Sequence, residues 1–435
     1  MVSLDSLNIV FIKRFSLSEP VFRPNRLKGS ILSKPNFNFL SNPEKINQLI
    51  NKNKRFELKE GWILKPIKNL SMPKDNFWRP FKHEPAPINL TGRKRLPFYP
   101  FQIIITDRLE INKSILKNAL GSEITDCRVN SQVRIFPPGA GAVHLYLYIK
   151  LDKFDLDATN DIFDFKNQII IRYRDKEVNL FDLFNSIINS VVNEISKENS
   201  NREVEGIYTL INFHGNELHV KENLSQLSKI LTGKAKPKPE EIEMERNKLL
   251  ENKLKGHDEN DLLAVSKKVS IIYIDQGLKK IHSHIKIQKG RHCFRNHFIN
   301  AVELAYVTDF LIDDYNRHFN EILDEIKTSS EDKSIHAKLN RLFHANVLDP
   351  GAYSTLLYSI RTVPENLHEI PWTYNVYTQA IKEFDISQKL KTNLEITNNL
   401  FEEAKKWNVQ ADMVKNIYNE IKDWVKIVAD LKSGK

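Results

Sequence analysis

The chain has few cysteines and no long apolar run. Its 435 residues include two cysteines, Cys127 and Cys293. That is too few for a disulfide framework or a four-cysteine zinc site, so both are expected to be reduced thiols. No run of about 18 apolar residues is present, and the stretch from Met1 to Arg14 lacks a signal-peptide pattern. These absences predict a cytoplasmic protein without a membrane segment.

Common nucleotide-binding and hydrolase motifs are also missing. The sequence contains no GxxxxGK[ST], GxGxxG, GxSxG or HExxH segment, which argues against the usual ATPases, dehydrogenases, serine hydrolases and zincins. The glycine-rich stretch 137–142 lies between two predicted strands, so it lacks the helix dipole that a phosphate site uses. We therefore expect no cofactor, and the sequence leaves open whether the protein is an enzyme.

Positive charge is concentrated near the N-terminus. The net charge is +10, and residues 1–100 hold 19 lysines and arginines against 7 aspartates and glutamates. Frequent prolines exclude long helices from this basic arm. Its aromatic residues stand beside cations, which suits stacking on unpaired bases while the cations meet phosphates. Alternatively, the arm wraps the body of the protein. The candidate nucleic-acid-binding residues are Arg23, Arg26, Trp78, Arg79, Lys82, Arg93, Lys94 and Arg95.

Residues 101–231 carry the clearest fold signal. A predicted strand at Phe101–Thr106 precedes a helix between Asn112 and Gly121, and a hairpin follows. A further short strand, a helix from about Asn179 and the strand Ile207–Phe213 complete the unit. This β-α-β-β-α-β order, with one additional strand, predicts a ferredoxin-like α+β domain.

The predicted hairpin places basic and aromatic side chains on one face of its sheet. If the two helices cover the other face, this face is open and resembles in character the surface on which RNA-recognition modules stack bases. The aromatic sequence pattern of those modules is absent. Another domain covering this face is the alternative. The outward residues are Arg128, Asn130, Gln132, Arg134, His144, Tyr146 and Tyr148, of which Arg128, Arg134, Tyr146 and Tyr148 are candidate nucleic-acid contacts.

The remaining chain divides into a charged segment and a helical region. Residues 232–262 are predicted to be a charged linker or an exposed helix, and residues 263–435 a β-hairpin plus a mainly α-helical domain. The longest helix has about 35 residues, through about Ile326. The last helix carries an apolar seam that packs within the chain or pairs with a protein partner or a second copy. The seam is Met413, Ile417, Ile421, Trp424, Val428 and Leu431.

Basic residues crowd the start of the longest helix. A helix N-terminus already carries about half a positive charge, so cations there repel one another unless an anion is bound. This predicts a phosphate or nucleic-acid site at Lys289, Arg291 and Arg295. The alternative is that the arginines extend into solvent or pair with acids of the same helix, such as Glu303, Asp309, Asp313 and Asp314.

Two catalytic patterns are weaker. His282, His284, His292 and His297 suggest zinc ligands, but the last two lie about 140° apart on a helix and do not converge. We expect no metal there. Asp161 with the run Asp164-Phe165-Lys166 matches the acidic-x-Lys pattern of metal-dependent nucleases. Such a short pattern arises by chance, and a polar loop is the alternative.

Charge distribution favours a non-enzymatic module that binds nucleic acid or another polyanion as a subunit of a larger complex. DNA and RNA are not distinguished. One alternative is a structural or protein-interaction subunit acting through its C-terminal helices. A second is a metal-dependent nuclease-like hydrolase in a microbial defence setting.

Overall fold

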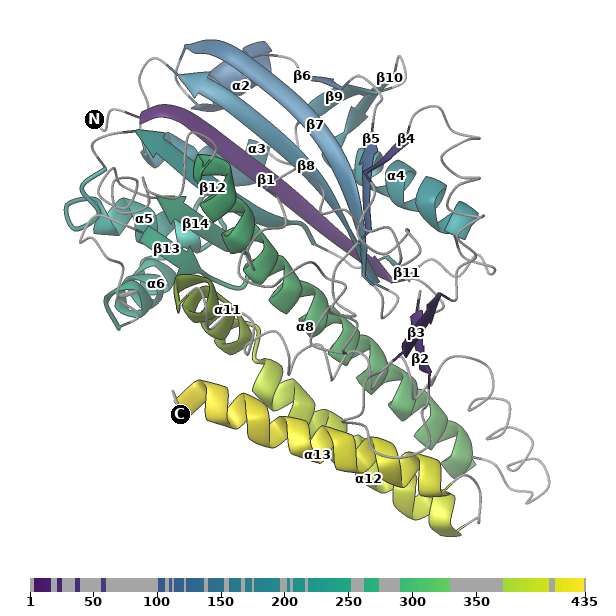
Figure 1. The fold of residues 1–435 in the computed structure, drawn as a ribbon. Coiled ribbons are helices and arrows are strands. Elements are labelled where there is room, and N and C mark those ends of the chain that lie inside the picture. Colours follow the sequence, from purple (N-terminus) through teal and green to yellow (C-terminus); the bar gives the residue numbers. More distant parts are fainter. Residues whose placement is uncertain are drawn as a thin grey trace.

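The computed structural model describes about three-fifths of the chain, in segments. The described residues are 4–16, 22–25, 36–39, 56–59, 101–105, 109–111, 113–120, 123–136, 140–151, 156–165, 169–173, 176–195, 202–203, 206–215, 218–251, 262–273, 290–328, 371–406 and 411–433. They form a mixed α+β structure, as the sequence predicts at this level (Figure 1).

The main sheet has nine strands in the described part of the chain. Its order is β13-β14-β12-β1-β8-β7-β5-β4, and β11 pairs with the end of β1. Neighbouring strands are antiparallel except for the parallel pair β12 and β14. The bounds are β1 Leu4–Ser16, β4 Phe56–Lys59, β5 Phe101–Ile105, β7 Ile124–Phe136, β8 Ala140–Leu151, β11 Arg202–Glu203, β12 Tyr208–Gly215, β13 Leu262–Val265 and β14 Val269–Tyr273.

Strand β1 lies in the middle of this sheet. It pairs with β8 along one edge and with β12 along the other. Leu7, Ile9 and Phe11 pack on one face while Val10 and Ile12 pack on the opposite face. A strand with apolar side chains on both faces suits a position between two layers. The first residues of the expected N-terminal arm therefore belong to the folded body, and the predicted first strand, Phe101–Thr106, corresponds to β5 on the outer side of β7.

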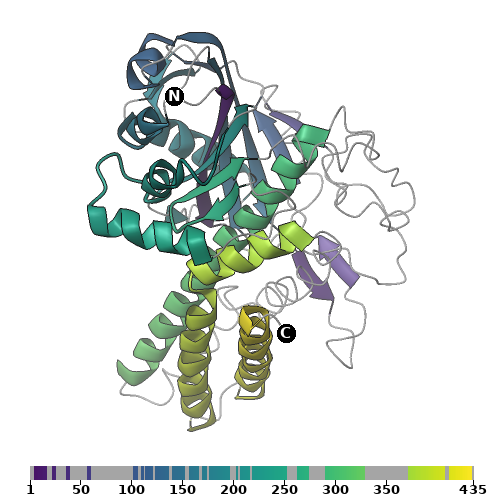
Figure 2. The ribbon, with the colours of Figure 1, turned by 90° about the vertical axis from the view of Figure 1, so that its left-hand side faces the viewer.

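Four helical elements and a small three-stranded sheet cover one face of the main sheet. The apolar side chains of α4, such as Leu183 and Phe184, share a core with Leu7 and Phe11 of β1 (Figures 1 and 2). The elements are α2 Lys113–Leu120, a 3-10 turn at Asp157–Asn160 leading into α3 Asp161–Phe165, α4 Leu180–Ile195, α5 Leu224–Leu231, and the strands β6 Glu110–Ile111, β9 Ile170–Tyr173 and β10 Lys176–Asn179. Helix α6, Pro239–Glu251, follows α5.

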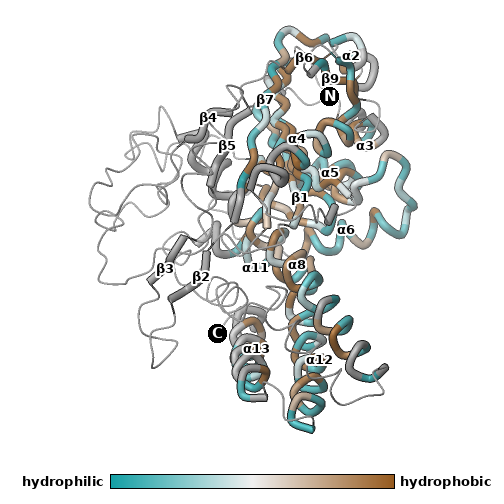
Figure 3. Tube along the Cα trace, turned by 90° about the vertical axis from the view of Figure 1, so that its right-hand side faces the viewer, coloured by the Kyte–Doolittle hydropathy of each residue, from teal (hydrophilic) through white to brown (hydrophobic). Residues whose placement is uncertain are grey.

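Helices from the C-terminal part cover the other face. Helix α8, Gly290–Thr328, runs along the sheet in the direction of β1 and continues past its end (Figure 1). Its residues Ala301 and Ala305 share a core with Val10 and Ile12. Beyond the sheet it packs with the remaining helices, which are α11 Pro371–Glu383, α12 Ile386–Lys406 and α13 Ala411–Ser433. Apolar and polar residues are interspersed along α12 (Figure 3).

The long helix confirms the apolar period of the sequence. Ala301, Ala305, Leu311, Tyr315 and Phe319 are all buried. In α13, the buried residues Val414, Ile421 and Val428 belong to the same core as α12. These stripes pack within the chain. Among the helices that the structure describes, none has the combination of length and apolar character needed to cross a membrane.

The expected glycine-rich hairpin loop is partly strand. Strand β8 begins at Ala140, so Gly141 lies inside it, paired with Phe15 of β1. A Cβ atom added at Gly141 would lie 2.1 Å from Cζ of the buried Phe15 ring. Glycine therefore permits close packing between β1 and β8 at this point rather than forming a turn.

The two small strands β2, Phe22–Asn25, and β3, Asn36–Phe39, form a separate pair.

Candidate functional site

Most predicted nucleic-acid contacts near the N-terminus lie outside the described residues. These are Arg26, Trp78, Arg79, Lys82, Arg93, Lys94 and Arg95. Lys289, directly before α8, also lies outside them. Arg23 lies in β2, and Arg291 and Arg295 in the first turns of α8, but their side chains are not described. Of the candidate metal ligands, His282 and His284 lie outside the described part and His292 and His297 belong to α8. All of these stay predictions.

The predicted open face of the hairpin is open at one end only. Arg128 has a side chain that is 77% exposed and pairs with Asp126, with 2.9 Å between Nε and Oδ2. Tyr148 is half-buried, as is Tyr146. Arg134 is 1% exposed, because α8 covers this end of the face. The expectation that Arg134 faces solvent is therefore corrected: its positive charge is neutralised inside the protein.

Five side chains form a closed ring of hydrogen bonds between the hairpin and α8. Arg134 donates from Nη1 to Glu303 Oε2. The other carboxylate oxygen of Glu303 lies 2.7 Å from His144 Nε2, and His144 Nδ1 lies 2.9 Å from the hydroxyl of Tyr146. The Gln132 amide closes the ring. With its oxygen toward these groups, it accepts hydrogen bonds from Nε and Nη2 of Arg134 at 3.2 Å and lies beside the Tyr146 hydroxyl.

The charges of this ring are sealed from solvent. Arg134, His144 and Glu303 are at most 2% exposed. Burial lowers the pKa of His144, an effect that the Arg134 charge reinforces and the Glu303 charge opposes. Burial alone would raise the pKa of Glu303, but the neighbouring Arg134 and His144 hold it below its usual value. The ring thus combines one guanidinium, one carboxylate and a neutral imidazole, which suits anchoring α8 to the sheet.

This ring makes stability depend on pH. The unfolded chain binds a proton at His144 near pH 6.5, whereas the folded protein keeps the imidazole neutral to lower pH. The unfolded state therefore binds more protons below about pH 6.5, and the free energy of unfolding falls as the pH is lowered through that value. The charged or polar groups facing His144 are Arg134, Glu303, Tyr146 and Gln132.

His144→Gln tests this expectation, because glutamine can still donate to Glu303 but does not titrate. The stability advantage of the unsubstituted protein over the variant should shrink between about pH 8 and about pH 5, as measured by urea unfolding at each pH. A difference that is constant over this range would contradict a neutral buried His144.

A second charged cluster joins β1, α8 and α12. Arg14 Nη1 lies 2.7 Å from Asp309 Oδ2, and the guanidinium stacks 4.0 Å above the centre of the Tyr306 ring. Lys389 of α12 pairs with both Asp309 and Asp313. Two cations thus meet two carboxylates at the end of the central strand. The cluster fixes α8 against the sheet and α12 against α8.

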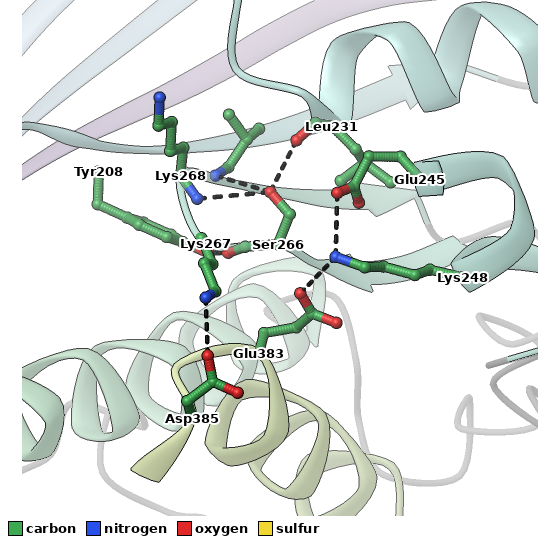
Figure 4. Close-up of polar contacts among 10 residues, drawn as sticks. Tyr208, Leu231, Glu245, Lys248, Ser266, Lys267, Lys268, Glu383 and Asp385 are labelled. Atoms are coloured by element: carbon green, nitrogen blue, oxygen red, sulfur yellow. Dashed lines mark hydrogen bonds and ion pairs between the residues drawn. The ribbon is translucent and has the colours of Figure 1, made fainter. Parts of the chain in front are cut away.

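A third cluster holds the junction of α11 and α12 against the β13–β14 turn (Figure 4). Lys248 of α6 lies 2.8 Å from Glu383 and 3.0 Å from Glu245. Lys267 lies 2.7 Å from Asp385, which has a φ of 54° between the two helices. Burial raises the pKa of Glu245, an effect that the Lys248 ammonium opposes. These contacts again join the C-terminal helices to the sheet.

The turn itself is held by hydroxyl groups. Ser266 Oγ donates to the carbonyl oxygen of Leu231 at 2.7 Å, and the Tyr208 hydroxyl donates to the carbonyl oxygen of Ser266 at 3.0 Å (Figure 4). Tyr208 is buried, and burial raises the pKa of its hydroxyl far above the usual value. The hydroxyl is therefore a structural donor.

The sequence interpretation missed what Glu303 and Asp309 contact. Pairing with arginines of their own helix was one alternative to the anion site, but they pair with Arg134 and Arg14 of the sheet. One signal was available. Glu303 and Asp309 lie within a stretch of α8 that is otherwise largely apolar, between Ala301 and Leu311. Acids within an apolar stretch indicate a buried cation on the surface against which the helix packs.

The described residues contain no metal-binding cluster that would support the catalytic alternatives. Within that part of the chain, no group of three or more His, Cys, Asp and Glu side chains is placed to hold a metal ion. Asp161 is exposed at the start of α3, where Asp164 also lies, and Lys166 is outside the described residues. Cys127 is a free cysteine whose burial raises its pKa to about 11. Its thiol stays protonated at neutral pH and is a poor nucleophile.

Comparison of the chain with protein-family models, with curated proteins and with solved structures finds no match.

Proposed function

We propose that the protein is a non-enzymatic module that binds nucleic acid or another polyanion within a larger complex. The supporting observation is the position of its surplus positive charge in the sequence. The sheet cations Arg14 and Arg134 are paired with acids of α8. Residues 17–100, in contrast, contain 17 lysines and arginines against 6 aspartates and glutamates. A surplus of this size in one segment favours contacts with phosphates.

The proposal includes a more specific topology for the sheet. The antiparallel order β12-β1-β8-β7, with α2 before β7 and α4 before β12, fits a β-α-β-β-α-β ferredoxin-like unit. In this assignment β1 replaces β5 as the first strand. The helices α8, α11, α12 and α13 would form a mainly α-helical domain that covers the face on which related folds bind RNA.

The binding test uses the full chain. Fluorescence anisotropy with labelled single-stranded DNA, duplex DNA and RNA, measured over a range of salt concentrations, is expected to show affinity that falls as salt rises. Replacing Arg93, Lys94 and Arg95 together by glutamine should weaken binding, because three phosphate-contacting charges are lost. Absence of binding at low salt to all three probes and to polyglutamate would refute the proposal.

A matched control removes the same charge elsewhere. Lys405, Lys415 and Lys422 are exposed on α12 and α13. Their triple replacement by glutamine should leave binding close to that of the unsubstituted chain. Equal weakening by the two triple variants would show that net charge alone governs binding and that the basic segment has no special part in it.

Two other functions are weaker proposals. A structural or protein-interaction subunit would act through the C-terminal helices, but the described apolar stripe of α13 packs within the chain. A metal-dependent nuclease-like hydrolase would require a metal cluster, and the described residues contribute none.

A further inference from the structure

The connection between α5 and α6 is held against the sheet. Residues 232–238 were expected to belong to a linker. In the structure, Ala235 packs against the core under the sheet. Gly233 has a φ of +66°, and a Cβ atom added there would lie 2.9 Å from Cβ of Lys268 in the β13–β14 turn. The connection and the turn are therefore in direct contact.

Further contacts fix the conformation of this connection. Lys234 pairs with Glu241, and the backbone N–H of Lys238 donates to Glu241 Oε2 at 3.0 Å. Pro237 and Pro239 flank Lys238. The ring of each proline restricts its own φ to a narrow range. A segment with these constraints has less conformational freedom to lose on binding than a flexible linker has.

Three exposed lysines lie on this connection and on the turn that it contacts. We call Lys236, Lys238 and Lys268 the lysine cluster: within the part of the chain that the structure describes, no ion pair within 4 Å is found for their ammonium groups, although the charge of Lys238 acts on Glu241. Lys234 and Lys267 stand beside them. These two lysines form ion pairs with Glu241 and Asp385, respectively.

The side chains of Lys267 and Lys268, adjacent in the β13–β14 turn, point in different directions. Lys267 reaches toward Asp385, whereas the side chain of Lys268 extends away from that pair (Figure 4). The exposed Glu240 at the start of α6 is the nearest acid in the sequence to Lys238 that has no described partner. Among the described residues of this surface, the three lysines without an ion pair outnumber the one such acid, Glu240, which leaves an excess of positive charge.

We propose that the lysine cluster binds the phosphate backbone of a nucleic acid, as a contact area additional to the basic N-terminal segment. The inference rests on the proposed function and assigns it a location on the folded body. Ammonium groups on flexible side chains bind phosphates as point charges, without reading bases. The cluster therefore adds affinity and salt dependence but no sequence preference.

The test neutralises the cluster without disturbing the backbone. The triple variant Lys236→Gln, Lys238→Gln and Lys268→Gln keeps the Cβ of Lys268 against Gly233. The variant Lys405→Gln, Lys415→Gln and Lys422→Gln loses the same charge on α12 and α13 and serves as the control. Anisotropy of labelled DNA and RNA is measured for the full chain and both variants over a range of salt concentrations, after their thermal unfolding curves have been compared.

The expected result is a smaller salt dependence for the cluster variant. Loss of three phosphate contacts should reduce the slope of log K against log salt by about 2 to 3, whereas the control should keep the slope of the unsubstituted chain. If the unsubstituted chain binds and the cluster variant has the same slope, this inference is wrong while the proposed function stands. If the unsubstituted chain binds none of the probes, the proposed function fails, and this inference fails with it.

Two further outcomes also overturn the inference. Equal loss by both triple variants would mean that the cluster acts only through net charge. Binding of polyglutamate but of no nucleic acid, with dependence on the same three lysines, would identify an acidic protein as the partner instead.

Discussion

Replacing Glu303 by alanine is expected to lower the free energy of unfolding by about 3–5 kcal/mol, since it leaves a buried charge without its partner. Glu303 accepts a hydrogen bond from Arg134, and it also receives the hydrogen bond of His144. Both partners are at most 1% exposed. Without the carboxylate, the buried Arg134 and His144 both lose this acceptor, or the contact of α8 with the sheet must open.

Urea unfolding of the variant and of a matched control measures this effect. Glu403→Ala is the same substitution in another helix, and the partner of Glu403 is Lys406, at 3.7 Å on the surface. Its loss should change stability by less than about 1 kcal/mol. A double variant, Arg134→Met with Glu303→Met, should be more stable than Glu303→Ala, because it buries no unpaired charge. A loss of less than 1 kcal/mol for Glu303→Ala would mean that the ring does not anchor α8.

A chain that begins at Leu17 is expected to show no cooperative unfolding transition. The deletion removes β1, which separates β8 from β12 and pairs with both. It also removes Leu7, Ile9 and Phe11 from one core and Val10 and Ile12 from the other. No other described segment pairs with β8 and β12 along these edges. The loss therefore exceeds the typical stability of a domain, about 5–15 kcal/mol.

Fragment complementation makes this result specific. A synthetic peptide with residues 1–16 should restore a thermal transition to the truncated chain in a concentration-dependent way, and a peptide of scrambled order should not. A truncated chain that unfolds cooperatively by itself would show that β1 is dispensable. The same reasoning limits the study of nucleic-acid binding: deletion of the whole basic arm, residues 1–100, would also remove β1, so substitutions in the full chain are the proper test.

Local patterns revealed much of the fold but not its assembly. Strands β7 and β8 and the long helix α8 were predicted because their apolar periods of about 2 and 3.6 residues are local properties. The run from Ile9 to Ile12 is also typical of a strand covered on both faces. Its partners, however, lie in β8 and β12, more than a hundred residues away. No local period contains that information.

The candidate site was difficult for the same reason. Alternation along the hairpin correctly grouped Arg134, His144 and Tyr146 on one face. It could not show that α8 would cover part of that face, since a buried ion pair and an exposed arginine look alike in a single strand. The exposure of Arg128 and the burial of Arg134 differ because Glu303 reaches only the second.

The central place of β1 also affects how the protein is made. Leu7 pairs with Phe213, so about 200 further residues must be synthesised before this strand meets its second neighbour. At about 5–20 residues per second this takes about 10–40 s. During that time β1 is an apolar strand with open edges, which is a site for mispairing. The risk of mispairing therefore lasts until β12 emerges and closes the second edge of β1.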